Sequence, residues 1–239
     1  MKAAVVVLPG SNCDHDCLHV LRDVLGVDAR FVWHKERELP PVDLVVLPGG
    51  FSYGDALRAG AIARFAPIME AVAAHARRGA LVFGICNGFQ ILAEAGLLPG
   101  ALLRNRDQHF VCQDVRLQVE HVESALTRTT GGRHILTMPV AHGEGRYHID
   151  AEGLRRMEGQ GQVLLRYLED DDRVGEVAGI NGSLAGIAGI MNAEGNVFGM
   201  MPHPERAAEP LVGGPAHGGS NTDGRLLFEG LLHDAESAR

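Results

Sequence analysis

A cysteine lies between two glycines directly after an apolar run of the chain. The run 80–83 is typical of a buried strand, and Gly84, Cys86 and Gly88 follow it at G-x-C-x-G spacing. In a nucleophile elbow, this spacing places the nucleophile on a sharp turn between a strand and a helix. Glycine neighbours let the helix begin at once and the substrate approach, and the helix N-terminus favours the thiolate. A buried structural cysteine is the alternative, but the flanking glycines favour a nucleophile.

Two residues near the C-terminus are suited to activate this cysteine. His203 and Glu205 flank Pro204, which disfavours the helical conformation at the preceding residue. We therefore expect an extended segment with His203 and Glu205 on one side. Glu205 would orient the imidazole while the other ring nitrogen faces the sulfur of Cys86, as in a Cys-His-acid triad. Alone, His-Pro-Glu is typical of a polar turn, and its pairing with the elbow makes the triad the stronger interpretation.

A third segment offers backbone donors for a developing negative charge. Pro48-Gly49-Gly50-Phe51 follows the apolar run 44–47, so its amides lie where a strand ends. An amide of Gly50 or Phe51, together with the amide of Asn87, would form a two-donor oxyanion hole. An ordinary Pro-Gly turn is the alternative.

The elements that must hold these residues form an α/β pattern. Unalternating apolar runs separated by helices predict a parallel sheet covered on both faces, a flavodoxin-like doubly wound fold. The expected strands are 3–8, 29–33, 44–47 and 81–85, and the expected helices are 13–25, 61–78, 88–95 and 223–233. The alternating stretch 115–120 and short strands at 135–141, 163–168, 184–191 and 196–201 predict a smaller antiparallel region. We expect residues 1–239 to form one domain.

Composition excludes several classes of protein. The 239 residues are 46% hydrophobic, and 22 basic against 30 acidic residues give a formal net charge of −8. Without a basic block, a nucleic-acid partner is not expected. The N-terminal apolar run is too short for a signal peptide, and no run approaches the ~20 apolar residues of a membrane helix. We expect a cytoplasmic protein that has no membrane partner.

The cysteines and glycines outside the elbow indicate neither a metal nor a nucleotide. Cysteines stand at 13, 17, 86 and 112, and the Cys/His cluster 13–19 has no second ligand pair at zinc-like spacing elsewhere. Capping a helix is the better use of that cluster, so we predict no metal site. The chain contains neither a G-x-x-x-x-G-K-[ST] phosphate loop nor a G-x-G-x-x-G fingerprint.

Taken together, these motifs resemble the class I, triad-type glutamine amidotransferases. The narrower resemblance is to the family of glutaminase subunits of phosphoribosylformylglycinamidine synthase. It is carried by segments 9–14, 48–55, 104–112, 141–145, 199–206 and 222–228. Asn87 after the nucleophile and the Ala-His-Gly-Glu-Gly run 141–145 are its discriminating parts. Asp107, where the family often has Ser, and Gln113, where it usually has a basic residue, depart from the pattern outside the triad.

The resemblance implies a role for each matching residue. Cys86 would attack the side-chain amide carbon of L-glutamine, and His203, oriented by Glu205, would protonate the departing ammonia and then activate water. Gly50, Phe51 and Asn87 would line the oxyanion hole. The implied substrate-binding residues are Gly50, Phe51, Gln90, His142, Gly143 and Glu144.

The resemblance also implies partners. The chain itself needs no cofactor, and ammonia would pass to a separate synthetase (large) subunit that uses ATP and Mg²⁺. That subunit would convert formylglycinamide ribonucleotide to formylglycinamidine ribonucleotide in de novo purine biosynthesis, with a small accessory subunit in the complex. The alternatives are the glutaminase subunit of another amidotransferase, a non-catalytic glutamine sensor, and a stand-alone cysteine hydrolase of the intracellular-protease type.

Overall fold

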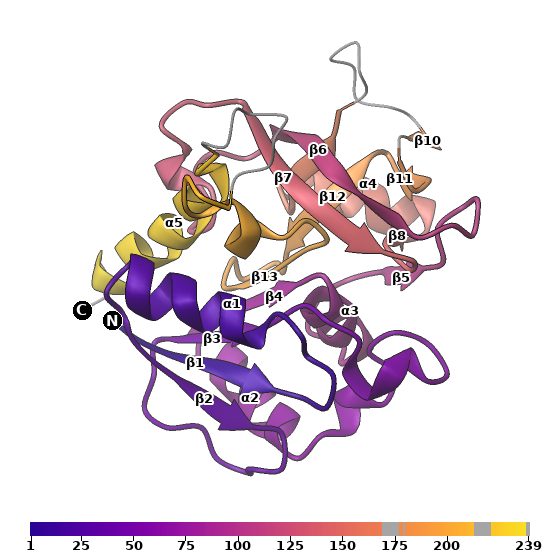
Figure 1. Cartoon of the computed structure of the whole chain (residues 1–239). Helices are drawn as coiled ribbons and strands as arrows, with labels where there is room; N and C mark the ends of the chain where they lie inside the picture. The colour runs from indigo at the N-terminus through magenta and orange to yellow at the C-terminus, as the bar shows by residue number, and fades with distance from the viewer. Residues whose placement is uncertain (169–176, 179, 213–220, 238–239) are drawn as a thin grey trace.

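One nine-stranded sheet organises the chain (Figure 1). The computed structural model describes residues 1–168, 177–178, 180–212 and 221–237. Across the sheet the strands follow the order β2-β1-β3-β4-β13-β12-β9-β6-β7. Their bounds in that order are Asp28–Trp33, Lys2–Val7, Leu44–Leu47, Leu81–Ile85, Val197–Met200, Ile187–Met191, Val163–Tyr167, Val111–Val119 and Ile135–His142.

The sheet changes from parallel to antiparallel pairing at β13. The pairs β2–β1, β1–β3, β3–β4 and β4–β13 are parallel, which confirms the predicted doubly wound α/β arrangement. The pairs β13–β12, β12–β9, β9–β6 and β6–β7 are antiparallel and continue the same sheet. Two small antiparallel sheets lie beside it, β5 (Ala101–Leu103) with β8 (Arg146–His148) and β10 (Val177–Ala178) with β11 (Ser183–Leu184).

Helices follow the strands of the parallel half. In Figure 1, α1 and α2 lie on opposite faces of the sheet, and α3 begins directly after β4. The α-helices are α1 (Asp14–His19, continued by a π-helical turn Val20–Val24), α2 (Ile68–Arg77), α3 (Asn87–Glu94), α4 (Ala151–Gly159) and α5 (Asp223–Ser237). Gly26 has φ +69°, as expected for the left-handed residue that ends a helix.

Two helix predictions need correction. The expected helix 61–78 is broken into a 3-10 turn, Ala63–Phe65, and α2, because Pro67 forces Ala66 into an extended conformation with ψ 138°. Helix α4 was not anticipated. Its N-cap is Asp150, whose side chain accepts a hydrogen bond from the Gly153 amide at 2.6 Å, a cap that the sequence does signal.

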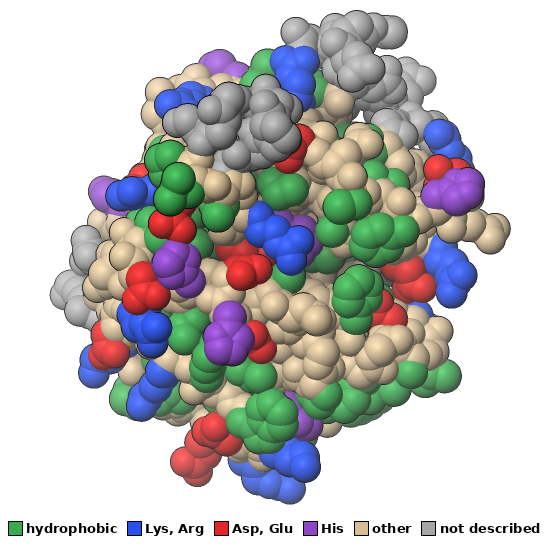
Figure 2. All heavy atoms as spheres, in the orientation of Figure 1, with side chains coloured by type: hydrophobic (Ala, Val, Ile, Leu, Met, Phe, Trp, Pro, Cys, Tyr) green, Lys and Arg blue, Asp and Glu red, His purple; other side chains and the backbone are tan. Residues whose placement is uncertain are grey.

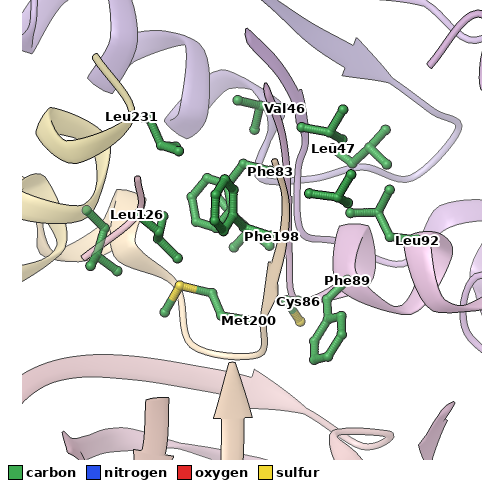
Figure 3. Packing of buried hydrophobic residues seen from close by; sticks show 14 of the residues in the cluster. Val46, Leu47, Phe83, Cys86, Phe89, Leu92, Leu126, Phe198, Met200 and Leu231 are labelled. Carbon is green, nitrogen blue, oxygen red and sulfur yellow. The ribbon is translucent and has the colours of Figure 1, made fainter. Parts of the chain in front are cut away.

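The core lies between the parallel strands and the helices that cover them (Figure 3). Phe83 on β4 and Phe198 on β13 are fully buried. Phe83 meets Phe228 of α5 edge-on at 5.8 Å between ring centroids. Buried aromatic pairs of this kind stabilise a core beyond their area alone. The packing fixes the ends of β4 and β13, the two strands that lead into Cys86 and His203.

The surface carries mixed charge. On the face drawn in Figure 2, acidic and basic side chains are interspersed with hydrophobic ones, some of which lie together. Within the described residues, no helix is both long and apolar enough to cross a membrane.

Candidate active site

Cys86 occupies a strained turn between β4 and α3. Its backbone dihedrals are φ 48° and ψ −105°, a combination that L-residues rarely adopt and that costs about 1–3 kcal/mol. Its amide donates to the Met200 carbonyl at 2.7 Å, so the turn is tied to the end of β13. The thiol lies 3.8 Å from the Ala141 carbonyl at the end of β7. A cysteine is thus held at the apex of an elbow, as the sequence predicts.

The two flanking glycines are sterically required. A Cβ on Gly88 would lie 1.9 Å from the Leu47 carbonyl oxygen, because α3 begins against the end of β3. A Cβ on Gly84 would lie 2.7 Å from the Gly88 carbonyl carbon. Real Cβ atoms do not approach backbone atoms this closely, so larger residues would push the helix away from the sheet.

His203 and Glu205 form a buried pair beside the elbow. His203 Nδ1 lies 2.6 Å from Glu205 Oε1, and the two side chains are 2% and 0% exposed. His203 is extended, with φ −104° and ψ 87°, as expected before Pro204, and its amide donates to the Pro139 carbonyl at 2.8 Å. Glu205 is not extended as predicted. It lies in the 3-10 turn Pro204–Ala207, which Pro204 begins, and that turn still brings its carboxylate to His203.

The charges around His203 favour its protonated form. Burial alone would lower the pKa of the imidazole, but the negative charges of Glu205 and Cys86 outweigh it, so the pKa of His203 is raised well above its ordinary value. If Nδ1 donates to Glu205, the other nitrogen, Nε2, is left to exchange a proton with Cys86. Among the described residues, Nε2 has no hydrogen-bond partner. This is the division of roles that a nucleophile, base and orienting acid require.

Cys13 lies beside His203, on the side of its Nδ1 atom. Its sulfur is 3.9 Å from His203 Nδ1 and accepts a hydrogen bond from Arg206 Nη2 at 3.0 Å. Cys13, His203 and Glu205 present potential ligand atoms within 4.8 Å of one another. His203 and Glu205 already bind each other, and the Arg206 guanidinium donates to Cys13. Because that guanidinium is positively charged, the arrangement does not favour a metal cation. Nor does it bring in His15 or His19 from the cluster 13–19.

The predicted oxyanion turn packs against the segment after β1. Gly50 has φ +141°, and a Cβ there would lie 2.4 Å from the Asn12 amide nitrogen, so this position requires glycine. The Phe51 amide donates to the Gly10 carbonyl at 2.8 Å. This predicted oxyanion donor is therefore already used in a backbone hydrogen bond. The amides of Gly50 and Asn87 have no hydrogen-bond acceptor within the described part of the chain. These two amides are therefore the donors that the conformation leaves available.

The Phe51 side chain lies at the surface rather than in the core. It is 49% exposed and stacks on Phe110 with 6.3 Å between ring centroids.

The residues expected to bind glutamine cluster around the elbow helix. Gln90 Nε2 donates to the Glu144 carbonyl at 2.6 Å, and Gln90 Oε1 accepts from Asn87 Nδ2 at 2.9 Å. His142 is buried, and burial, followed by the charge of His203, lowers its pKa to about 4. His142 is therefore neutral near pH 7. Gly143 links His142 to Glu144, and its carbonyl accepts from the Asn105 amide at 2.9 Å.

Asn105 is a site residue to which the sequence assigned no role. Its Nδ2 donates to the carbonyls of His109 and His142 at 2.8 and 2.9 Å. Its Oδ1 accepts from the Gly145 amide at 3.1 Å and lies 3.2 Å from His142 Nδ1. Because Oδ1 can only accept, Nδ1 carries the proton of His142, and Nε2 is left as a buried acceptor. Asn105 belongs to a segment of the family resemblance, but no spacing rule connects it to His142.

The two departures from the family pattern lie outside this network. The Asp107 side chain accepts from the His109 amide at 3.1 Å and shapes an exposed turn. Gln113 is an exposed residue of β6, opposite Val140 of β7.

Comparisons with known proteins agree with this geometry. A family model described as the CobB/CobQ-like glutamine amidotransferase domain matches residues 1–229. The phosphoribosylformylglycinamidine synthase subunit PurQ of Salinibacter ruber is 55% identical over 232 residues, which cover 97% of this chain and 96% of that protein. The chain belongs to the PurQ family of glutamine amidotransferases. The PurQ subunit of Aquifex aeolicus is 52% identical over 234 residues, covering 98% of this chain and 100% of that protein.

One solved structure supports the same family, and a second shares the fold. The structure of PurLQS from Thermotoga maritima contains a chain with a TM-score of 0.83 and 44% identity, with 97% of both chains covered. The glutaminase domain of Trypanosoma brucei CTPS with bound acivicin has a TM-score of 0.59 and 13% identity, covering 99% of this chain and 94% of that one. At that identity the likeness concerns the fold alone.

Proposed function

We propose that this chain is the glutaminase subunit of phosphoribosylformylglycinamidine synthase. It hydrolyses L-glutamine to glutamate and ammonia, which the synthetase subunit uses in purine biosynthesis. The observation that carries the proposal is the buried His203–Glu205 pair beside a cysteine on a strained elbow. The relatives that are 51–55% identical over nearly the whole chain indicate to which amidotransferase this chain belongs.

The reaction begins with the sulfur of Cys86. The thiolate adds to the side-chain amide carbon of glutamine, and the amides of Gly50 and Asn87 stabilise the oxyanion that forms. The carbon–nitrogen bond then breaks, and protonated His203 gives its proton to the leaving nitrogen as ammonia departs. Next, His203 takes a proton from water, the resulting hydroxide adds to the thioester, and a second oxyanion collapses to glutamate and free Cys86. Throughout, Glu205 holds the imidazole in one orientation.

The chain's partners follow from the fate of the ammonia. The related PurQ protein of Thermotoga maritima was solved as part of PurLQS, which supports assembly of this chain with a large synthetase subunit and a small accessory subunit. ATP and Mg²⁺ belong to the synthetase in this proposal. A cytoplasmic location fits that pathway. A glutamine sensor or a peptide hydrolase would not need such a complex.

The test is reconstitution with the two partner subunits, followed by assay with formylglycinamide ribonucleotide, ATP and glutamine. We expect formylglycinamidine ribonucleotide to form, and glutamine hydrolysis to exceed that of the isolated chain by more than about tenfold, or ~1.4 kcal/mol of barrier. Cys86→Ala should abolish the glutamine-dependent reaction and retain the reaction with added ammonia. Equal loss of both reactions in a folded variant would argue against a nucleophilic role for Cys86. An unlabelled Cys86 after treatment with a diazo ketone analogue of glutamine, with normal glutamine binding, would favour the sensor.

A further inference from the structure

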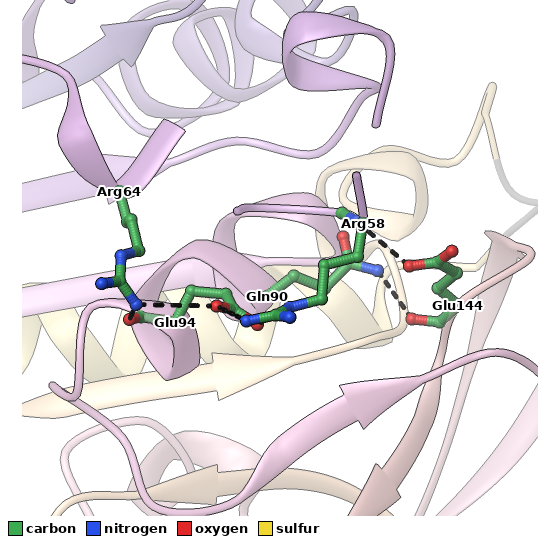
Figure 4. Close-up of polar contacts among 6 residues, drawn as sticks. Arg58, Arg64, Gln90, Glu94 and Glu144 are labelled. Atoms are coloured by element: carbon green, nitrogen blue, oxygen red, sulfur yellow. Dashed lines mark hydrogen bonds and ion pairs between the residues drawn. The ribbon is translucent and has the colours of Figure 1, made fainter. Parts of the chain in front are cut away.

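Segment 51–59, which we call the strap, is fastened to both ends of α3. At the N-terminal end, Asn87 Oδ1 accepts hydrogen bonds from the Ser52 amide at 3.0 Å and from the Ser52 hydroxyl. At the C-terminal end, the Glu94 carboxylate accepts two hydrogen bonds from the Arg58 guanidinium, at 2.6 and 2.7 Å. Figure 4 shows Arg58, Gln90 and Glu94 along this helix, with Glu144 beside them.

The strap adopts a conformation that requires such ties. Tyr53, Asp55 and Leu57 have φ values of 54°, 52° and 71°, and non-glycine residues seldom adopt this left-handed region. Directly after the strap, Gly60 meets α3 so closely that a Cβ would lie 2.8 Å from the Gln90 carbonyl carbon. Contacts with the rest of the molecule must therefore offset the strain of the strap.

Asn87 is the stronger of the two ties. Its carboxamide is buried, and Nδ2 donates to Gln90 Oε1 at 2.9 Å and to Asp55 Oδ1 at 3.4 Å. With the two bonds from Ser52, all four hydrogen-bonding positions of the carboxamide are used. The Arg58 side chain is 58% exposed, and exposed ion pairs contribute little.

The same carboxamide reaches the glutamine-binding segment. Gln90, which accepts from Asn87, donates to the Glu144 carbonyl at 2.6 Å. The Glu144 carboxylate in turn accepts from the Ala59 amide at 3.1 Å. One buried side chain therefore joins the strap, the elbow helix and segment 142–145.

We propose that the side chain of Asn87 is a positioning residue for the oxyanion site. The backbone N–H of Asn87 is one of the two donors, and its carboxamide holds, at Ser52, the segment that supplies the other donor at Gly50. The spacing between the donors therefore depends on this side chain as well as on the hydrogen bond from the Phe51 amide to the Gly10 carbonyl. This inference rests on the proposed function, because glutamine hydrolysis is the reaction that uses these donors.

The first test is Asn87→Ala in the reconstituted complex. The backbone donor remains, but the strap loses its buried tie. We expect kcat for glutamine hydrolysis to fall at least tenfold, KM for glutamine to change less than threefold, and synthesis from added ammonia to be unaffected. Asn196→Ala is the matched control, because Asn196 is also buried and donates to the carbonyls of Ala76 and Ala80 at 2.8 and 2.9 Å, away from the site. Its kcat per folded molecule should stay at the wild-type value.

The second test uses pH and the variant Asn87→Asp. A protonated Asp keeps an acceptor for Ser52 and one O–H donor. An ionised Asp loses both donors and adds a charge beside Asp55 of the strap and Gln90 Oε1, with Glu144 on the facing segment. The cations nearby, Arg58 and Arg104, pair with Glu94 and Glu144. We expect the ratio of variant to wild-type kcat to rise at least tenfold from pH 8 to pH 5.5.

Two results would overturn the inference. They are a kcat for Asn87→Ala within threefold of wild type, and a ratio for Asn87→Asp that does not change with pH. If Asn87→Ala fails to fold, the pH dependence of Asn87→Asp decides. A wild-type complex that cannot hydrolyse glutamine would instead refute the proposed function itself.

Discussion

The pair His203–Glu205 gives the sharpest prediction, through the substitution Glu205→Gln. The carboxylate and the imidazole lie 2.6 Å apart and are almost fully buried. Gln can still accept a hydrogen bond from Nδ1, so the variant removes the charge and keeps the shape. A charge-assisted hydrogen bond is worth about 1.5–3 kcal/mol, against about 1 kcal/mol for a neutral one. If this difference of about 0.5–2 kcal/mol appears in the transition state, kcat/KM for glutamine should fall by about 2- to 30-fold.

The pH profile gives an independent measure. The negative charge of Glu205 helps to raise the pKa of His203, which keeps the imidazole protonated further into the alkaline range. Without that charge, burial dominates and the pKa of His203 falls. The alkaline limb of kcat/KM for glutamine should therefore move to lower pH in Glu205→Gln.

The assay is steady-state glutamine hydrolysis by the reconstituted complex from pH 5.5 to 10. Glu209→Gln serves as control, since Glu209 is partly exposed, lies near the same turn and pairs with His19 at 2.8 Å, away from Cys86. It should retain wild-type kcat/KM. A Glu205→Gln variant with unchanged kcat/KM and an unmoved alkaline limb would refute an electrostatic role for Glu205.

Two further predictions concern stability. Gly88→Ala should destabilise the chain by at least about 3 kcal/mol in denaturant unfolding, because its Cβ would overlap the Leu47 carbonyl, whereas Gly159→Ala, with no atom within 4 Å of the new Cβ, should be neutral or stabilising. Equal effects would contradict the steric argument. Burial, followed by the charge of Glu144, raises the pKa of Asp55 to about 6. The native state therefore binds this proton more tightly than the unfolded chain does, and the free energy of unfolding falls as pH rises through 6. Asp55→Asn should therefore raise the free energy of unfolding by about 1 kcal/mol at pH 7.5, after allowance for partial exposure, and by almost nothing at pH 4. An equal gain at both pH values would exclude this titration as the cause.

The parts of the site that sequence reasoning recovers are those encoded by local patterns. Glycine spacing located Cys86, and the apolar runs located β1, β3 and β4. Pro204 correctly indicated the extended backbone of His203. In each case the physical cause lies within a few residues of its effect, as a steric demand for glycine or a restriction imposed by proline.

The parts of the site that sequence reasoning did not recover depend on contacts between segments far apart in the chain. Asn87 was singled out for its backbone amide, whereas its side chain binds Ser52, 35 positions earlier. Asn105 reaches His142 and Gly145 across 37 and 40 positions. Hydrogen bonds of this kind have no periodicity, so a single sequence gives no signal for them. The break at Ala66 differs, because Pro67 was visible in the sequence and marked the end of a helix.

The change from parallel to antiparallel pairing explains how so buried a site is assembled. Cys86 and His203 follow β4 and β13, the last parallel pair, so their strands end at the same edge of the sheet. The antiparallel half then returns β7 over that edge, where the carbonyl of Pro139 binds the His203 amide at 2.8 Å and the carbonyl of Ala141 lies 3.8 Å from the thiol. Cys86 and segment 142–145 therefore come from opposite halves of the sheet, and their relative position is not fixed by strand pairing alone. Buried side chains that cross between the halves, such as Gln90, can fix that relative position. For this reason we expect the hydrogen-bond network around α3 to affect kcat although its side chains do not touch the reacting atoms.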